Sequence, residues 1–368
     1  MRKIKVFQIA RHEKTDFIKS AIVADFDYYF YRIPEPLYNY FFWRYIKAKI
    51  KVLLKILKIK PDVLIIYEFQ GFPFGLILLL LAKILKIKTI MHFELPEEAF
   101  PHKNDNLAKL IIKIIRLPFI ILTAKLASKL QVFTKWEVQT LSKFVKIEKI
   151  RVIPYGTSFE IKTLPKDDYI FTVARWSDRK NLQTILRVFK SVISSNNNNI
   201  NIYLIIGGKF CNGSYYIPEK GKWETCKEYK DKILKLIEEL ELKNNIIFLG
   251  FIPKNELKMF YRKARIFYLP SKMETFGRVY VEAMASGTPI VAMKNSAVQY
   301  VVKDGVTGFL RNDEKGQKEA ILKLLTDEKL YKEMQRNCLK EAKKYRWENV
   351  TKKWERLIKE LVEEKNVC

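Results

Sequence analysis

The chain of 368 residues, 48% of them hydrophobic, is long enough for two domains of about 150 to 200 residues, each with its own core. Its formal net charge of +28 favours an acidic partner, namely nucleic acid, anionic lipid or a phosphorylated small molecule, unless it reflects only a lysine-rich composition. The cysteines, which are Cys211, Cys226, Cys338 and Cys368, form no CxxC pair, which argues against a zinc site and favours reduced thiols in a cytosolic protein.

The apolar runs of the chain are too short for export or for a membrane span. The first run, which lies between basic residues, is five residues long and is shorter than the apolar core of a signal peptide. The longest runs, at residues 76–82 and 117–124, fall well below the roughly 18 residues that a spanning helix needs. We therefore expect a cytoplasmic protein without a membrane-spanning segment.

Short apolar runs rich in isoleucine and valine alternate with amphipathic stretches along the chain. The runs that we expect to be strands are residues 5–10, 63–67, 89–92, 130–134, 152–154, 170–174, 202–206, 246–249, 266–269 and 290–292. Runs of this kind are typical of strands that are buried on both faces of a parallel sheet, with helices between them. The alternation therefore predicts a doubly wound α/β architecture.

Turn residues and charge interrupt this pattern from Pro154 to Asp168, which predicts a domain boundary. We expect an N-terminal domain at residues 1–155 and a C-terminal domain at residues 156–344. Apolar residues at helical spacing follow, and they are Trp347, Val350, Trp354, Leu357, Ile358 and Leu361. Residues 345–368 should thus form a terminal helix that packs back toward the N-terminal domain.

Two glutamates flank a strand-to-helix turn in the second half. In open α/β sheets, ligands bind beyond the carboxyl ends of the strands, where helix N-termini offer free N–H groups. Glu274 lies in the loop after the strand at 266–269, Gly277 would let the backbone approach a ligand, and Glu282 falls within the following helix. The two carboxylates can then accept hydroxyl groups at two ends of one ligand. The alternative is that both are ordinary surface charges.

Cations and glycines mark the other strand ends of the same half. Arg175 comes just after the strand at 170–174, and Lys180 lies at the entrance of the next helix, a placement that suits a diphosphate. Gly208 follows the strand at 202–206, and Phe251 and Ile252 follow the strand at 246–249.

An ordered series of motifs runs from residue 152 to the C-terminal part of the chain. The series is VIPYG at 152–156, Ala-Arg at 174–175 with the later lysine, FLGFIP at 248–253, YRKARIFYLPS at 261–271, ETFG at 274–277, EAMASGTPIV at 282–291 and DGVTGFL at 304–310. This series resembles the retaining glycosyltransferases of glycosyltransferase family 4, the group 1 glycosyl transferases of the GT-B fold. The resemblance implies two Rossmann-like, doubly wound α/β domains that face a central cleft.

The resemblance also implies roles for individual residues. Glu274 is expected to contact the donor sugar and Glu282 the nucleotide ribose, in the Glu-x7-Glu motif of the family, whereas Arg175 and Lys180 hold the diphosphate. Further donor-binding positions are Phe276, Gly277, Arg278, Gly208, Phe251 and Ile252. In the N-terminal half, which resembles the family much less, the strand at 89–92 ends in His92, the candidate residue near the reacting sugar. The alternative for this histidine is a structural role at a strand end.

The implied function is transfer of a hexosyl group from a nucleotide-diphosphate sugar to a glycan, lipid-linked or other hydroxyl acceptor, with retention and without a metal or other cofactor. The alternatives are a nucleotide-sugar epimerase of the same fold and a basic non-catalytic binding protein. Nucleic acid is not an expected partner, because no binding module is recognisable. Asp25-Phe26-Asp27 has the spacing of a metal-binding Asp-x-Asp motif, but the two-half organisation favours the metal-free fold.

Two segments of the first half combine lysine or arginine with bulky apolar residues and contain no acidic residue, at 45–60 and 109–123. A helix with a basic and an apolar face can lie in a membrane interface. We therefore predict peripheral attachment to the anionic inner face of the membrane, centred on Lys47, Lys49, Lys51 and Lys55. The alternative, favoured for the second segment, is that the apolar faces pack on the first sheet.

Overall fold

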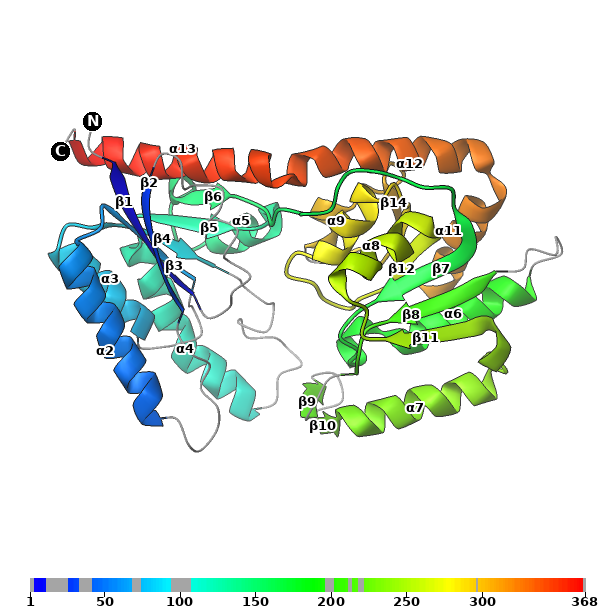
Figure 1. The fold of residues 1–368 in the computed structure, drawn as a ribbon. Coiled ribbons are helices and arrows are strands. Elements are labelled where there is room, and N and C mark those ends of the chain that lie inside the picture. Colours follow the sequence, from blue (N-terminus) through cyan, green and yellow to red (C-terminus); the bar gives the residue numbers. More distant parts are fainter. Residues whose placement is uncertain are drawn as a thin grey trace. The chain divides into compact units, whose positions relative to one another are not determined.

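The computed structural model describes residues 3–10, 26–32, 42–67, 74–93, 107–195, 202–210, 214–217, 222–295 and 297–366. The chain divides into two compact units (Figure 1). The described residues of unit 1 lie within Met1–His102, Leu107–Gly156 and Trp347–Cys368, and those of unit 2 lie within Thr157–Arg346.

Unit 1 contains a six-stranded sheet in which all neighbouring strands are parallel. In spatial order the strands are β2 (Phe26–Arg32), β1 (Ile4–Ala10), β3 (Val63–Ile66), β4 (Lys88–His92), β5 (Lys129–Val132) and β6 (Ile150–Val152). The central strands β3 and β5 are buried at every position, as expected for a sheet that is covered on both faces.

Helices cover both faces of this sheet. One core joins the sheet to α2 (Phe42–Ile59), α3 (Phe74–Ile84), α4 (Leu107–Leu126) and α5 (Lys135–Leu141). The second core joins the opposite face to α13 (Trp347–Asn366), through Val350, Trp354, Leu357, Ile358 and Leu361. Figure 1 shows α13 on one side of the sheet and α2 to α4 on the other. The last helix of the chain therefore completes the first unit.

Unit 2 contains a second six-stranded parallel sheet. In spatial order its strands are β11 (Ile246–Gly250), β8 (Tyr203–Gly207), β7 (Asp167–Val173), β12 (Ala264–Leu269), β13 (Ile290–Ala292) and β14 (Gly308–Leu310). A separate antiparallel hairpin is formed by β9 (Ser214–Ile217) and β10 (Lys222–Thr225).

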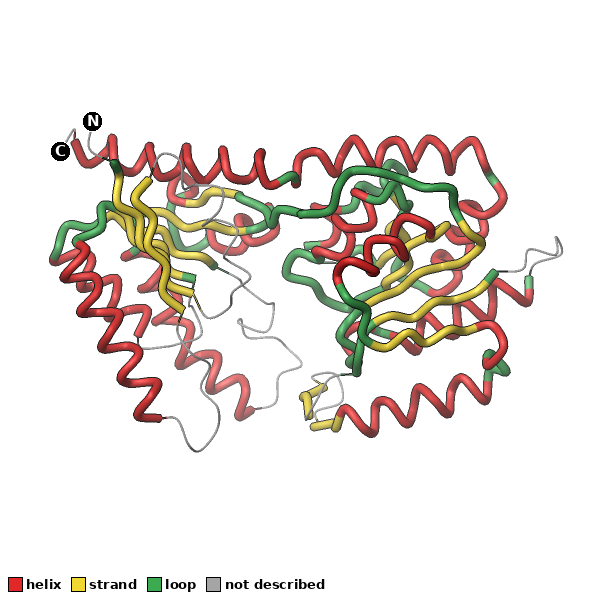
Figure 2. Tube along the Cα trace, in the orientation of Figure 1, coloured by secondary structure: helices red, strands yellow, loops and turns green. Residues whose placement is uncertain are grey.

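The helices of unit 2 form two groups that cover the sheet, as Figure 2 shows. In one group α6 (Leu182–Ser194) contacts both α7 (Cys226–Glu239) and α11 (Glu314–Thr326), and in the other α9 (Arg278–Ala285) contacts both α8 (Lys254–Lys263) and α12 (Glu328–Ala342). The short α10 (Val298–Val301) follows β13.

The predicted doubly wound α/β architecture is confirmed, since each expected strand overlaps an observed parallel strand. Four observed strands were not predicted, namely β2, β9, β10 and β14. The sequence of β2, FDYYFYR, is aromatic rather than aliphatic, the hairpin strands are short and polar, and β14 has three residues. None of them has the aliphatic run on which the prediction rested.

Two further expectations concern membrane spans and cysteines. Among the described residues, no helix has both the length and the apolar character needed to cross a membrane. Cys226, at the start of α7, is disulfide-bonded, so the expectation of reduced thiols is wrong at this position. Sequence spacing could not reveal this bond, because a disulfide depends on proximity in the fold rather than along the chain. Cys338 is a buried free thiol.

Candidate functional site

The carboxyl ends of four neighbouring parallel strands of unit 2 lie along one edge of its sheet. Strands β7, β8, β11 and β12 end at Val173, Gly207, Gly250 and Leu269. The loops that follow them carry the unit 2 residues that the sequence singled out: Arg175, Lys180, Gly208, Phe251, Ile252, Glu274, Phe276, Gly277 and Arg278, with Glu282 in the next helix. The fold thus gathers these candidates at the edge where ligands of α/β sheets bind.

Lys180 and Glu274 form an ion pair at this edge. Lys180 Nζ lies 2.6 Å from Glu274 Oε1, and the two side chains are 15% and 10% exposed. A charge-assisted hydrogen bond of this length in a partly dehydrated place holds both groups in fixed positions. Arg175 is exposed, and no ion pair of this residue is found in the described part of the chain. Of the two cations predicted to hold the diphosphate, Lys180 is therefore held by an ion pair and Arg175 faces the solvent.

The two loops that carry this pair are cross-linked. Lys272 Nζ donates to Asp178 Oδ2 at 2.6 Å, and the Lys272 N–H donates to the carbonyl of Arg179 at 2.9 Å. Asn181 has left-handed backbone geometry (φ 58°) and donates from its side-chain amide to the carbonyl of Pro270 at 3.3 Å. These contacts join the loop after β7 to the loop after β12, so both can present one rigid surface.

Gly277 is the N-cap residue of α9 and adopts φ 78° and ψ 61°, the left-handed region that glycine tolerates best. A Cβ atom at this position would lie 2.5 Å from the ring of Tyr280, which is anchored by a 2.9 Å hydrogen bond from its hydroxyl to the carbonyl of Leu269. The glycine therefore allows a tight entry into α9, whose first N–H groups are oriented as in an anion site. Arg278 is exposed at this helix start, whereas Phe276 is 2% exposed and packs edge-on against a tyrosine ring.

Glu282 is half-buried within α9 and is oriented by a residue that the sequence analysis missed. The hydroxyl of Tyr261, in α8, donates to Glu282 Oε2 at 3.2 Å. Burial, followed by the adjacent Glu282 charge, raises the pKa of Tyr261 well above its ordinary value, so the hydroxyl remains a donor. A carboxylate held in this way keeps its second oxygen in a defined direction.

Close backbone packing shapes the neighbouring strand ends. Gly208 has φ 99°, and a Cβ atom there would lie 1.8 Å from the carbonyl oxygen of Ala174, so only glycine fits. Its N–H donates to the carbonyl of Gly250 at 2.5 Å. Phe251, which is 66% exposed, follows this contact, and Ile252 is buried. The Lys209 ammonium lies over the exposed ring of Phe251, 5.3 Å from its centroid, whereas the isoleucine side chain belongs to the packing beneath.

His92 lies in unit 1, at the carboxyl end of β4, and is 4% exposed. Its Nδ1 is 2.5 Å from Oε1 of Gln131, whose Nε2 donates to the carbonyls of Val132 and Ile153. Because Nε2 of the glutamine is committed to these carbonyls, its oxygen must accept from the histidine. When the imidazole is neutral, its proton therefore lies on Nδ1, and the buried Nε2 is the acceptor nitrogen. Stacking on Tyr67, with ring centroids 4.6 Å apart, also fixes the ring plane.

No cluster of three or more histidine, cysteine, aspartate or glutamate side chains suited to a metal occurs within the described ranges. Of the Asp-x-Asp motif, Asp25 lies outside those ranges, and Asp27 is half-buried in β2.

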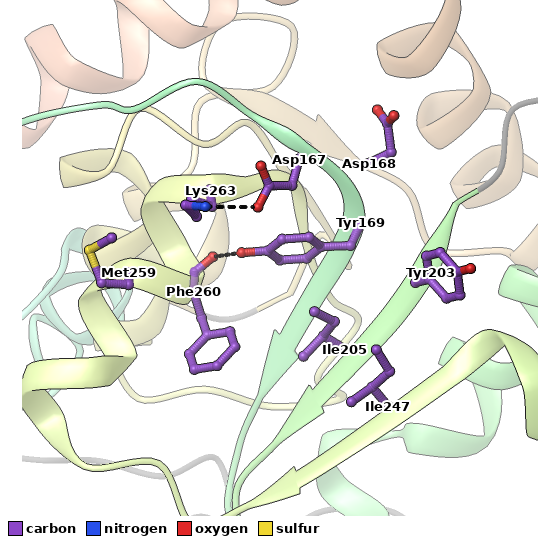
Figure 3. Close-up of a pocket in the computed structure, with 9 residues that line it drawn as sticks. All are labelled: Asp167, Asp168, Tyr169, Tyr203, Ile205, Ile247, Met259, Phe260 and Lys263. Carbon is purple, nitrogen blue, oxygen red and sulfur yellow. Dashed lines mark hydrogen bonds and ion pairs between the residues drawn. The ribbon is translucent and has the colours of Figure 1, made fainter.

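A pocket of about 660 Å³ lies at the opposite edge of the unit 2 sheet (Figure 3). The residues that line it are Asp167, Asp168, Tyr169, Tyr203, Ile205, Ile247, Met259, Phe260 and Lys263. They include the first residues of β7 and β8, which are the amino ends of these strands. Two contacts join polar groups of its lining: Lys263 pairs with Asp167 at 3.3 Å, and the Tyr169 hydroxyl donates to the carbonyl of Phe260 at 2.8 Å. This pocket is separate from the candidate site.

Residues 157–344, just over half of the chain, match the family described as Glycosyl transferases group 1. An uncharacterised glycosyltransferase of Methanocaldococcus jannaschii is 32% identical over 149 residues, which are 36% of this chain and 42% of the relative. The alpha-monoglucosyldiacylglycerol synthase of Streptococcus pneumoniae is 27% identical over 199 residues, 49% of this chain and 40% of the relative. The matched stretches thus span less than half of these relatives.

Among solved structures, the Anabaena protein HepE, crystallised with UDP and glucose, superposes with a TM-score of 0.73 at 15% identity, covering 97% of this chain and all of that chain. Likeness at this level of identity establishes the shared fold, which is the two-domain, Rossmann-like GT-B architecture. By its match over unit 2, the chain belongs to the glycosyl transferases group 1 family.

Proposed function

We propose that the protein is a retaining glycosyltransferase that moves a sugar from a nucleotide-diphosphate sugar to a hydroxyl group of an acceptor. The observation that carries the proposal is the ion pair of Lys180 with Glu274 beside the start of α9, at the carboxyl edge of the unit 2 sheet. This edge combines cations, the N-terminus of a helix and a carboxylate, which are the groups that a sugar diphosphate needs. Family membership supports the reaction class.

The donor is proposed to replace the ion pair as the partner of both groups. The diphosphate accepts hydrogen bonds from Lys180, from Arg175 and from the first N–H groups of α9, and Glu274 then accepts hydroxyl groups of the sugar. Glu282, oriented by Tyr261, accepts a ribose hydroxyl. In the absence of donor, the 2.6 Å contact keeps the lysine and the first glutamate in place, so little reorganisation is needed when the donor binds.

The proposed chemistry keeps the configuration at the anomeric carbon. The bond from this carbon to the diphosphate oxygen breaks, the acceptor oxygen bonds to the same face, and its proton passes to the departing diphosphate. Arg175 and Lys180 stabilise the charge that grows on the leaving group, which is the largest electrostatic change in the step. Because two side-chain cations supply this stabilisation, we propose that the reaction needs no metal ion.

The acceptor is proposed to be a glycan or lipid-linked alcohol that meets unit 1 near His92. Gln131 holds the histidine ring in one tautomer, in which Nε2 is the nitrogen that can accept a hydrogen bond. The name of the pneumococcal relative indicates that this relative makes a glucosylated diacylglycerol, which supports a lipid acceptor. We accordingly propose a cytoplasmic enzyme that works at the inner face of the membrane.

A screen of nucleotide sugars by thermal shift tests the proposal. A donor present at 100 times its dissociation constant stabilises the native state by about 2.7 kcal/mol, a shift that is readily measured. The expected result is stabilisation by one class of nucleotide sugar and its loss in an Arg175→Ala, Lys180→Ala variant. Failure of every UDP, GDP, ADP and TDP sugar to stabilise the protein would contradict the proposal. Analysis of sugar products without acceptor separates transfer from epimerisation, because only an epimerase forms a new nucleotide sugar.

A further inference from the structure

Three helices of unit 1 expose apolar side chains on the surface that faces away from the sheet. The exposed residues are Ile50, Leu54 and Leu57 on α2, Ile77, Leu80 and Ile84 on α3, and Ile111, Ile114, Ile115 and Leu122 on α4. They supply ten of the twenty large hydrophobic side chains that are exposed in the described residues. Apart from the adjacent Ile114 and Ile115, neighbouring members within each helix lie three, four or seven residues apart, so they form a stripe along one side. We call the combined surface the α2–α4 outer face.

The exposed apolar stripes do not result from a poorly packed core of unit 1. The inner sides of the same helices fill the core of unit 1, where Val52 of α2, Leu78 of α3 and Ile120 of α4 are buried. The alternative that the apolar residues of α4 simply pack on the sheet is therefore only half correct, since one side of the helix is buried and another is exposed. A helix in a soluble protein normally carries polar residues on its outer side. The exposed stripes therefore indicate a surface that contacts a partner.

The three helices lie next to one another. α3 contacts α4, and Lys49 of α2 lies over the ring of Phe74, the first residue of α3, at 4.9 Å from its centroid. Figure 1 shows the three helices on the same side of the unit 1 sheet. The stripes can accordingly meet one extended partner, which fits a flat surface better than a single peptide.

The charges of this face are of one sign. No aspartate or glutamate occurs in α2, α3 or α4. Exposed lysines flank the apolar stripes, and they are Lys47, Lys51, Lys55 and Lys58 on α2, Lys83 on α3 and Lys125 on α4. The ammonium group of Lys55 lies over the ring of Tyr31, at 4.8 Å, so its stem already covers apolar surface.

We propose that the α2–α4 outer face binds an anionic lipid bilayer, with its apolar side chains in the interfacial region and its lysines among the headgroups. Long lysine side chains can reach outward to the phosphates while isoleucine and leucine enter the acyl boundary. A second copy of the chain suits this face poorly, because a symmetric contact would place the same basic surface against itself. This lipid contact rests on the proposed function, in which the enzyme works at a membrane, but its test does not require enzymatic turnover.

The structure places the proposed membrane contact differently from the sequence prediction. Of the four lysines at which the sequence centred it, Lys49 is half-buried over Phe74, so it is less accessible than the other three. The apolar stripe of α3, with Ile84 77% exposed, was not part of the prediction. We therefore expect α3 to contribute to insertion, with the lysines of α2 and α3 adding the electrostatic attraction.

Vesicle co-sedimentation of the full chain tests the proposal, with vesicles of phosphatidylcholine alone or mixed with phosphatidylglycerol. Leu80→Gln with Ile84→Gln should lower partitioning onto anionic vesicles at least tenfold, because both side chains lose apolar contact with lipid. Lys51→Glu with Lys58→Glu should lower it at least tenfold and weaken its salt dependence. The matched control is Leu234→Gln with Lys230→Glu on α7, where the leucine is 45% exposed. This control should bind like the unchanged protein.

An Ile84→Trp variant adds a direct reading of insertion. Its fluorescence should shift to shorter wavelength with anionic vesicles and be quenched by brominated acyl chains. Equal pellet fractions for the α3 variant, the α2 variant and the α7 control would overturn the proposal, as would binding that is indifferent to phosphatidylglycerol. Concentration-dependent self-association that is lost in the α3 variant, without vesicle binding, would assign the face to a second copy instead. Loss of donor binding with intact vesicle binding would refute the proposed function alone.

Discussion

Replacing Lys180 by methionine should reduce both the stability and the turnover of the protein, for two separable reasons. In the structure, Lys180 Nζ lies 2.6 Å from Glu274 Oε1, and the carboxylate side chain is only 10% exposed. Removing the lysine leaves this carboxylate without that cation, at a place where too little water reaches it to replace the lost interaction. Breaking a buried pair from one side costs about 3 kcal/mol, which for a unit of this size corresponds to a decrease in Tm of about 6 to 12 °C.

The double variant Lys180→Met, Glu274→Gln distinguishes the two effects. It removes both charges, so most of the lost stability should return, and the coupling between the two sites can be measured by a double-mutant cycle. Turnover should not return, because the diphosphate still lacks its cation, and the loss should be ~100-fold or more. Thermal unfolding and initial rates with the true donor provide the two measurements.

A matched control is available in the same unit. Lys303 pairs with Glu341 at 2.8 Å, but this lysine is 49% exposed and Lys344 pairs with the same carboxylate at 2.8 Å. Lys303→Met therefore leaves Glu341 with a cation, so it should cost less than about 1 kcal/mol and leave turnover unchanged. The reasoning would be refuted if Lys180→Met were as stable as the unchanged protein, since the pair would then carry no energy. Near-normal turnover in both Lys180→Met and Arg175→Ala would refute the role of these cations at the diphosphate.

Three other predictions follow from the same geometry. Glu282→Gln should weaken binding of the free nucleoside diphosphate in calorimetry and Glu274→Gln should not; equal losses would mean that the two roles are confused. Activity should survive EDTA, and its abolition with rescue by manganese would contradict the proposed metal-free mechanism. Burial lowers the pKa of Lys166 from 10.5 to about 7, so the unfolded state binds the extra proton and stability should rise between pH 7 and 10.5, by about 1 kcal/mol per pH unit. Chemical denaturation of Lys166→Met should lack this slope, and an identical slope would exclude Lys166 as its source.

Local patterns allowed prediction of the strands and of the elements that carry the site. The aliphatic runs correspond to parallel strands, and Glu274 and Glu282 lie in the loop and the helix that follow β12, as expected. Features of this kind depend on neighbours along the chain, so the sequence alone shows them. Gly277 was singled out for close approach of the backbone to a ligand, and the structure adds that its backbone is left-handed.

Contacts between distant segments could not be predicted. The pairing of Lys180 with Glu274 joins residues 94 positions apart, and it depends on β7 lying next to β12 in the sheet. Gln131 is the residue that sets the tautomer of His92, yet nothing in its local sequence marks it. The exposed stripe of α3 belongs to an apolar run that is equally compatible with a buried helix. Each of these features follows from the strand order or from which side of a helix faces the sheet.

The anomeric configuration of the product tests the central claim most directly. The protein would be incubated with the donor that stabilises it and with a hydroxyl acceptor, and the anomeric proton of the new glycoside would be followed by NMR from the first turnovers. We predict that the product keeps the α or β configuration of the donor sugar and that free nucleoside diphosphate appears in equal amount. A glycoside of inverted configuration, or a new nucleotide sugar formed without acceptor, would contradict the account.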